Sequence, residues 1–175
     1  MAALLTLSCD APPQLPGTQL GTYNVIGTLG TNTCGTGLGA PSPWDFTVQL
    51  SEDTTTSPTT FYWLPSVGSQ LSNGMTSTTK VSISSTVTSN IGGSEATDAS
   101  AAVEGPCDLQ QSTQLDLTLG LGSPPTTFTG SLTYTFVTST GVSTTSDCTD
   151  ELTSSGGQFD TLPCTTTYTL TAGHQ

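Results

Sequence analysis

The strongest constraint on the fold is a two-residue alternation of apolar and polar side chains. It is clearest between Leu115 and Leu121, where every second residue is leucine. Successive side chains of a β-strand point to opposite faces, so this period predicts strands with one buried face. No window shows the period of an amphipathic helix. Parallel sheets are also disfavoured, because their doubly buried strands read as continuous apolar runs.

The alternation predicts strands in seven regions, which are separated by turn signals rich in Gly, Pro and Asn. The predicted strands are 22–29, 46–50, 61–64, 81–87, 115–121, 128–136 and 162–170. The predicted turns are Asn73-Gly74, Gly92-Gly93, Gly105-Pro106, Ser123-Pro124-Pro125, Gly141 and Gly156-Gly157. Longer loops are expected at Ser51–Thr60 and Ile91–Gly105. The prediction is an all-β fold, an antiparallel up-and-down meander of about eight strands closed like a barrel, with a β-sandwich as the alternative.

The cysteines indicate an oxidising compartment. One of the five cysteines, Cys9, lies near the amino terminus. The other four form an even set that can pair completely into disulfides: Cys34, Cys107, Cys148 and Cys164. Proximity in sequence around the Gly156-Gly157 turn predicts a Cys148–Cys164 bond, which leaves Cys34 with Cys107. No two cysteines have the short spacing of a zinc site, so metal binding is the weaker reading.

The charge balance excludes several classes of partner. Lys and Arg together contribute one residue against 13 acidic residues, for a formal net charge of -12. Nucleic-acid binding depends on Lys and Arg side chains that neutralise phosphates, so DNA and RNA are excluded as partners. The same deficit argues against a basic patch that attracts anionic lipid headgroups.

The amino terminus is a short apolar run that ends in a small residue and a cysteine. Its end, Thr6-Leu7-Ser8-Cys9, resembles the lipobox of bacterial lipoprotein signal peptides. In that family, cleavage leaves the cysteine as the first residue, and its acyl chains insert into a bilayer. The resemblance implies a lipid on Cys9 and an extracytoplasmic location in the cell envelope. A terminal strand with a buried free thiol is the alternative.

The chain is expected to divide into three parts. Residues 1–8 are a signal-peptide remnant, residues 9–19 hold the lipidated cysteine and a Pro-rich spacer, and residues 20–175 are a single β domain. A chain of 175 residues is long enough for one domain with a real core. No apolar stretch reaches the ~18 residues that a spanning helix needs, so we expect the domain to sit on the membrane rather than to span it. We also expect a monomer.

The first predicted strand opens on Gly21-Thr22-Tyr23. This triplet resembles the Gly-x-Trp signature of lipocalins, with Tyr in place of Trp. The resemblance implies a barrel rather than a sandwich, and a small ligand inside it. A barrel of about eight strands has an interior just wide enough for side chains or for one small ligand.

Groups for catalysis or metal binding are few. The sole histidine, His174, is the penultimate residue, where chains are commonly loose. Asp116 stands between two leucines of a predicted strand and is expected to face solvent. Asp147, Asp150 and Glu151 lie close together, with calcium binding as the alternative to a solvated turn. We therefore expect no catalytic residue, no metal and no cofactor, and a hydrolase with paired carboxylates is only the third hypothesis.

Aromatic residues are the best candidates for a binding site. Trp44, Tyr62 and Trp63 offer a platform for a sugar ring or an apolar ligand, although aromatic residues commonly fill β-domain cores. The rings of Phe61-Tyr62-Trp63 cannot all face one side of a strand, so at least one points outward. The leading hypothesis is a lipid-anchored, non-enzymatic structural or interaction module with an unknown protein or small-molecule partner. The alternative is a lipocalin-like binder of a small apolar ligand or sugar.

Overall fold

The strands form one antiparallel sheet, as the alternation predicts. The computed structural model describes residues 14–75, 77–91, 107–139 and 147–175. Its 8-stranded sheet has the order β4-β3-β2-β1-β8-β7-β6-β5. The strands are β1 (Thr18–Asn32), β2 (Trp44–Asp53), β3 (Thr60–Pro65), β4 (Leu71–Gly74), β5 (Lys80–Ile91), β6 (Cys107–Leu119), β7 (Thr127–Thr138) and β8 (Cys164–His174).

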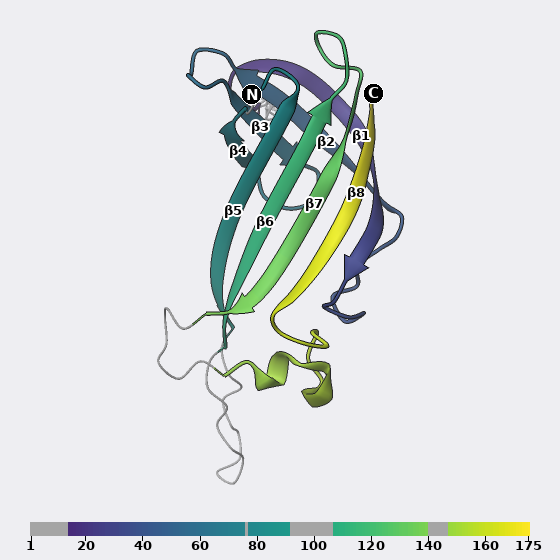
Figure 1. The fold of residues 1–175 in the computed structure, drawn as a ribbon, viewed down its shortest axis with the longest axis vertical. Helices are drawn as coiled ribbons and strands as arrows, with labels where there is room; N and C mark the ends of the chain where they lie inside the picture. Colours follow the sequence, from purple (N-terminus) through teal and green to yellow (C-terminus); the bar gives the residue numbers. More distant parts are fainter. Residues whose placement is uncertain (1–13, 76, 92–106, 140–146) are drawn as a thin grey trace, which may run out of the picture.

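The sheet curves into a nearly closed barrel. The first and last strands, β1 and β8, pair in the middle of the sheet, which leaves β4 and β5 at its edges. These edges meet where Met75 forms a bridge with Val81 and the Asn73 side-chain amide donates to the Ser82 carbonyl at 3.1 Å. The predicted meander with a barrel-like closure is therefore confirmed, and the sandwich is not observed (Figure 1).

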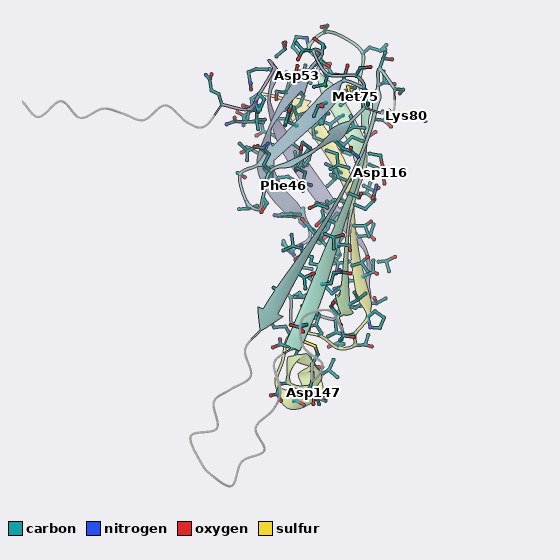
Figure 2. All side chains as sticks on the ribbon, turned by 90° about the vertical axis from the view of Figure 1, so that its left-hand side faces the viewer. Phe46, Asp53, Met75, Lys80, Asp116 and Asp147 are labelled. Carbon is teal, nitrogen blue, oxygen red and sulfur yellow. A yellow bond between two sulfur atoms is a disulfide. The ribbon has the colours of Figure 1, made fainter. Side chains whose placement is uncertain are left out.

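The two halves of the sheet differ in strand length. The strands β2, β3 and β4 have 10, 6 and 4 residues, whereas β5 to β8 have 11 to 13. The long strands therefore continue past the barrel as an open sheet (Figure 1). Figure 2 shows Asp53 and Met75 at the barrel end of the molecule and Asp147 at the opposite end, which we call the lower end.

The barrel interior is filled by the side chains that the alternation directs inward. Tyr23, Phe61, Trp63 and Phe128 are each at most 2% exposed. The ring centroids of Tyr23 and Trp63 lie 5.4 and 5.7 Å from that of Phe128. Burial of one large apolar side chain contributes about 1.5–3 kcal/mol. These rings occupy the space in which a lipocalin-like barrel would hold a ligand.

Three sequence expectations are wrong in detail. Leu121 does not continue the buried leucine face, because β6 ends at Leu119 and the Leu121 side chain is 89% exposed. Asn73-Gly74 is not a turn between strands but the end of β4. Val87 shares the inner face of β5 with the buried Val81, yet it is 62% exposed because that part of β5 lies below the closed barrel.

Several predicted features lie outside the described residues. They are the signal-peptide remnant 1–8, Cys9, the turns at 92–93, 105–106 and 141, and the predicted 91–105 loop beyond Ile91. The described chain begins inside the predicted spacer, where Leu15 is already buried. The Ser51 hydroxyl donates to the Pro16 carbonyl at 2.7 Å, so this segment packs on the β domain ahead of residue 20.

Two disulfides lie at the lower end, but their pairing differs from the prediction. Cys34 is bonded to Cys164, and Cys107 to Cys148. Proximity in sequence suggested Cys148–Cys164, and this pairing is wrong because strand adjacency decides it. The closure of the sheet places β1 beside β8, so Cys34, just after β1, meets Cys164 at the start of β8.

The cysteines form the centre of a second, smaller apolar cluster. Leu109 and Phe159 are buried in it, and the ring centroids of Phe136 and Phe159 lie 5.2 Å apart. Cys148 leads into two 3-10 turns, η1 (Thr149–Glu151) and η2 (Thr153–Ser155). Across the described ranges, no helix is long and apolar enough to cross a membrane.

The disulfide pairing can be checked directly. Non-reducing peptide mapping should recover Cys34 with Cys164 and Cys107 with Cys148. The Cys34→Ala/Cys164→Ala double variant should lose about 2–5 kcal/mol of unfolding free energy in chemical denaturation, because that bond closes the longer loop. Recovery of a peptide that joins Cys148 to Cys164 would contradict the structure.

Candidate ligand-binding groove

The open lower half of the sheet has a concave face lined by the same residue positions that fill the barrel above. Two rows of neighbouring residues cross this face from β5 to β8, as the strand register shows. The upper row is Ser85, Thr113, Tyr134 and Thr166, and the lower row is Val87, Gln111, Phe136 and Cys164. Because β2 to β4 end above these rows, no strand of the described chain faces them.

A groove runs over these rows and has two compartments. The β8-side compartment, of about 270 Å³, is walled by the segment 38–41 that leads into β2. The β5-side compartment, of about 180 Å³, is walled by the segment 65–71 that joins β3 to β4. Trp44, Gln111 and Tyr134 line both compartments, so the two are continuous around these three side chains.

Trp44 forms the aromatic centre of the groove. It opens β2, where the barrel wall ends, and its side chain is only partly buried. Its ring centroid lies 4.5 Å from that of Phe46 and 5.2 Å from that of Tyr168. These neighbours hold the indole in place at the lower mouth of the barrel. Trp63 and Phe46 are buried on the barrel side of Trp44, and Trp63 also lines the β5-side compartment.

Gln111 and Tyr134 bring polar atoms to this apolar surface. Both side chains are partly buried, and neither forms a side-chain hydrogen bond with another described residue. Burial first, and the neighbouring Tyr168 second, raise the pKa of the Tyr134 hydroxyl to about 12. The Tyr134 hydroxyl is therefore neutral at physiological pH. The amide and the hydroxyl are available to a ligand that carries hydrogen-bonding groups of its own.

None of the described residues that line the two compartments carries a charged side chain. Recognition of a carboxylate, phosphate or ammonium group usually relies on an opposite charge or on a set of aimed donors. The described lining offers no charge, its side-chain donors are neutral groups such as the Gln111 amide and the Tyr134 hydroxyl, and the net charge of -12 repels anions at long range. The groove is therefore suited to an uncharged ligand that combines apolar and hydroxyl-rich faces.

The structure separates the three aromatic residues that the sequence analysis proposed. Trp44 lines both compartments and Trp63 lines one, whereas Tyr62 lines neither. Tyr62 alternates with the buried Phe61 and Trp63, so it is the outward ring that the strand pattern required. Sequence reasoning missed Gln111 entirely and gave Tyr134 no role beyond its place in the predicted strand 128–136.

The possible catalytic groups lie away from the groove. Contrary to expectation, the described chain end is anchored. Strand β8 includes His174, and the backbone N–H of Gln175 donates a hydrogen bond to the Thr22 carbonyl at 2.9 Å. The His174 ring packs edge-on against Tyr23, with centroids 5.0 Å apart, at the barrel end of β8. Asp116 faces solvent as predicted, and it accepts a hydrogen bond from the Ser82 hydroxyl at 2.6 Å.

The acidic cluster at 147–151 forms a turn. Asp147 accepts hydrogen bonds from the backbone amide and the hydroxyl of Thr149, at 3.0 and 2.6 Å, and these bonds lower the pKa of its carboxyl. Among the residues that the structure describes, no three His, Cys, Asp or Glu side chains are placed to hold a metal ion.

The Tyr134 pKa makes a prediction about alkaline stability. A tyrosine whose folded-state pKa exceeds its ordinary value of about 10 contributes stability that is complete below pH 10 and is lost as pH rises towards 12. The Tyr134→Phe variant should therefore show a shallower fall of unfolding free energy between pH 10 and 12, measured by denaturant titration. The Tyr62→Phe variant is the matched control for removal of a hydroxyl. Equal slopes for Tyr134→Phe and wild type would contradict the prediction.

Comparison with known proteins adds no relative from which a site could be transferred. No family model matches the chain, and neither a curated protein nor a solved structure matches it. The proposals that follow therefore rest on the residues and geometry of this chain.

Proposed function

We propose that this protein is a non-enzymatic interaction module of the cell envelope that binds an uncharged carbohydrate in the groove beside Trp44. The observation that carries this proposal is the pairing of an aromatic platform with the unbonded polar groups of Gln111 and Tyr134. A sugar ring has an apolar face of C–H groups, which suits Trp44, and peripheral hydroxyls, which suit the amide and the phenol.

The polar groups favour a carbohydrate over a purely apolar ligand. An acyl chain in the groove would cover the Gln111 amide without offering it a hydrogen bond. Leaving a buried polar group unsatisfied costs about 1–3 kcal/mol. A ligand with hydroxyl groups avoids this cost and gains the hydrogen bonds.

The groove, rather than the barrel interior, is the binding site in this proposal. Four large rings (Tyr23, Phe61, Trp63 and Phe128) fill the barrel, so a ligand held in the manner of a lipocalin would have to displace part of the core. The groove is open to solvent and needs no such displacement.

The cysteines support an extracytoplasmic, lipid-anchored location. The four downstream cysteines are all consumed in two disulfides, as is typical of proteins from oxidising compartments. Cys9 is then the remaining cysteine of the sequence. A lipid on Cys9 accounts for this odd residue, and Leu15 packs on the domain only a few residues further along the chain.

Carbohydrate binding can be measured through the intrinsic fluorescence of Trp44 and Trp63. Neutral oligosaccharides of glucose, mannose and N-acetylglucosamine should be titrated into the full chain, and at least one should cause a saturable change. Trp44→Ala should weaken its binding at least about tenfold. Gln111→Leu should weaken it about fivefold, because one hydrogen bond contributes about 1 kcal/mol.

The matched control for this titration is Tyr62→Ala, which removes an aromatic ring outside the groove and should leave the affinity unchanged. Binding of a fatty acid but of no oligosaccharide would replace the carbohydrate with an apolar ligand. Absence of binding by both classes would refute the groove as a ligand site and favour a purely structural role.

The lipid anchor is tested separately from the groove. Wild-type protein should partition into the membrane fraction of a bacterial expression host and carry acyl chains on Cys9 in mass spectrometry. Cys9→Ala should shift the protein to the soluble fraction, because each buried methylene contributes about 0.8 kcal/mol to membrane binding. Retention of Cys9→Ala in the membrane would show that another feature anchors the protein.

A further inference from the structure

The lower half of β5 is an open strand edge. The strand pairs with β6 along its whole length, from Lys80 to Ile91. On its other side, the Met75–Val81 bridge and the hydrogen bond from Asn73 to Ser82 join it to β4 and the residue after β4, near the barrel end. From Ile83 onward, no described strand pairs with this side of β5, and the side chains of Ser84 and of 86–89 are exposed. Every second residue there directs its backbone N–H and C=O away from β6.

This edge lacks the features that usually block pairing with another chain. Exposed edges are commonly protected by charged side chains, by proline or by a bulge. Residues 81–91 contain no charged residue and no proline, and their register with β6 has no shift. The exposed part consists of Ser, Thr and Val, of which Thr and Val favour extended backbone.

The sequence of the edge is symmetric about Val87. Thr86 and Thr88 flank it, and Ser85 and Ser89 follow on either side. In an antiparallel pair of identical strands centred on Val87, each residue from Ser85 to Ser89 therefore meets a residue of its own kind. Cross-strand pairs of Thr and of β-branched side chains stabilise antiparallel sheets.

We propose that two copies of this chain pair antiparallel through β5, with Val87 opposite Val87 of the second copy. This register buries an apolar side chain that is 62% exposed in the single chain. It also keeps both concave faces on the same side, because directly opposed residues of antiparallel strands point to the same face. The lower row of the groove then continues across the pair, from Gln111 through the two Val87 side chains to the second Gln111.

The charge of the chain opposes this dimer without blocking it. Each copy carries a net charge of -12, so the copies repel at low ionic strength. The neighbouring strand β6 carries two acidic side chains, Asp108 and Asp116. Asp108 is buried, and Asp116 points to the opposite face, where it accepts a hydrogen bond from the Ser82 hydroxyl. Because salt screens repulsion beyond about 10 Å at 0.1 M, dimerisation should strengthen as NaCl is raised.

Sedimentation velocity on the full chain carrying Cys9→Ser tests the proposal, because neither a lipid nor the amino-terminal thiol can then join two copies. We expect a concentration-dependent dimer that strengthens between about 0.02 and 0.3 M NaCl. Val87→Lys should weaken the dimer at least about tenfold, since it opposes two like charges. Ile26→Lys is the matched control, because Ile26 is 49% exposed on β1, a strand paired on both sides, and this variant should dimerise as the parent does.

Cross-linking tests the register itself. Under mild oxidation, Val87→Cys should form a disulfide between two copies, whereas Ser89→Cys should not, because it lies opposite Ser85. The proposal would be overturned if the chain stays monomeric at high salt, or if Val87→Lys leaves the dimer affinity unchanged. Both measurements are made without ligand, so a failure here leaves the carbohydrate proposal untouched, and the converse also holds.

Discussion

The contact between β4 and β5 closes the sheet only where the short strands β2 to β4 lie opposite the long strands β5 to β8. The level at which the short strands end determines where the core, the groove and the open edge lie. Above it, inward side chains such as Trp63 meet an opposite wall and form a dry core. Below it, no strand of the described residues lies opposite the same faces of β5 to β8. The groove occupies that uncovered face, and the open edge of β5 borders it. One difference in strand length therefore produces the core, the candidate site and the proposed dimer interface.

The lower end of the open sheet is stabilised by covalent bonds where an apolar core is small. Its buried cluster contains the four cysteines with Leu109 and Phe159, far fewer side chains than the barrel core. In the chain-entropy model, closing loops with sequence separations of 130 and 41 residues stabilises the fold by about 5 and about 4 kcal/mol. These contributions are comparable to burying two or three large apolar side chains. An open sheet can therefore keep its shape at that end without a second wall.

Sequence patterns predicted the strands well because the alternation is a local property of the backbone. The inward faces of Tyr23, Val25, Leu115 and Leu117 follow from it directly. Features that depend on which strands become neighbours could not be predicted in this way. The disulfide pairing was wrong because nothing local to Cys148 and Cys164 reports that β1 lies beside β8. The groove was missed for a related reason, since Gln111 and Thr113 continue the leucine face of β6 with polar residues. When the inward face of a predicted strand changes from apolar to polar residues, the strand extends beyond the apolar core.

The Cys34–Cys164 bond links the compartment of the protein to its candidate site. Cys34 begins the segment that leads through Leu38 and Pro41 into Trp44, and this segment walls the β8-side compartment. The bond fixes the start of the segment to β8, and β2 fixes its end to β1. With the bond reduced, the start of the segment would lose its covalent link and keep hydrogen bonds such as those from the Thr33 N–H to the Thr165 carbonyl and from the Asp160 N–H to the Cys34 carbonyl. The segment would then gain conformational entropy that opposes an ordered wall. The disulfide that indicates an oxidising compartment therefore also helps to hold the wall of the candidate groove in place.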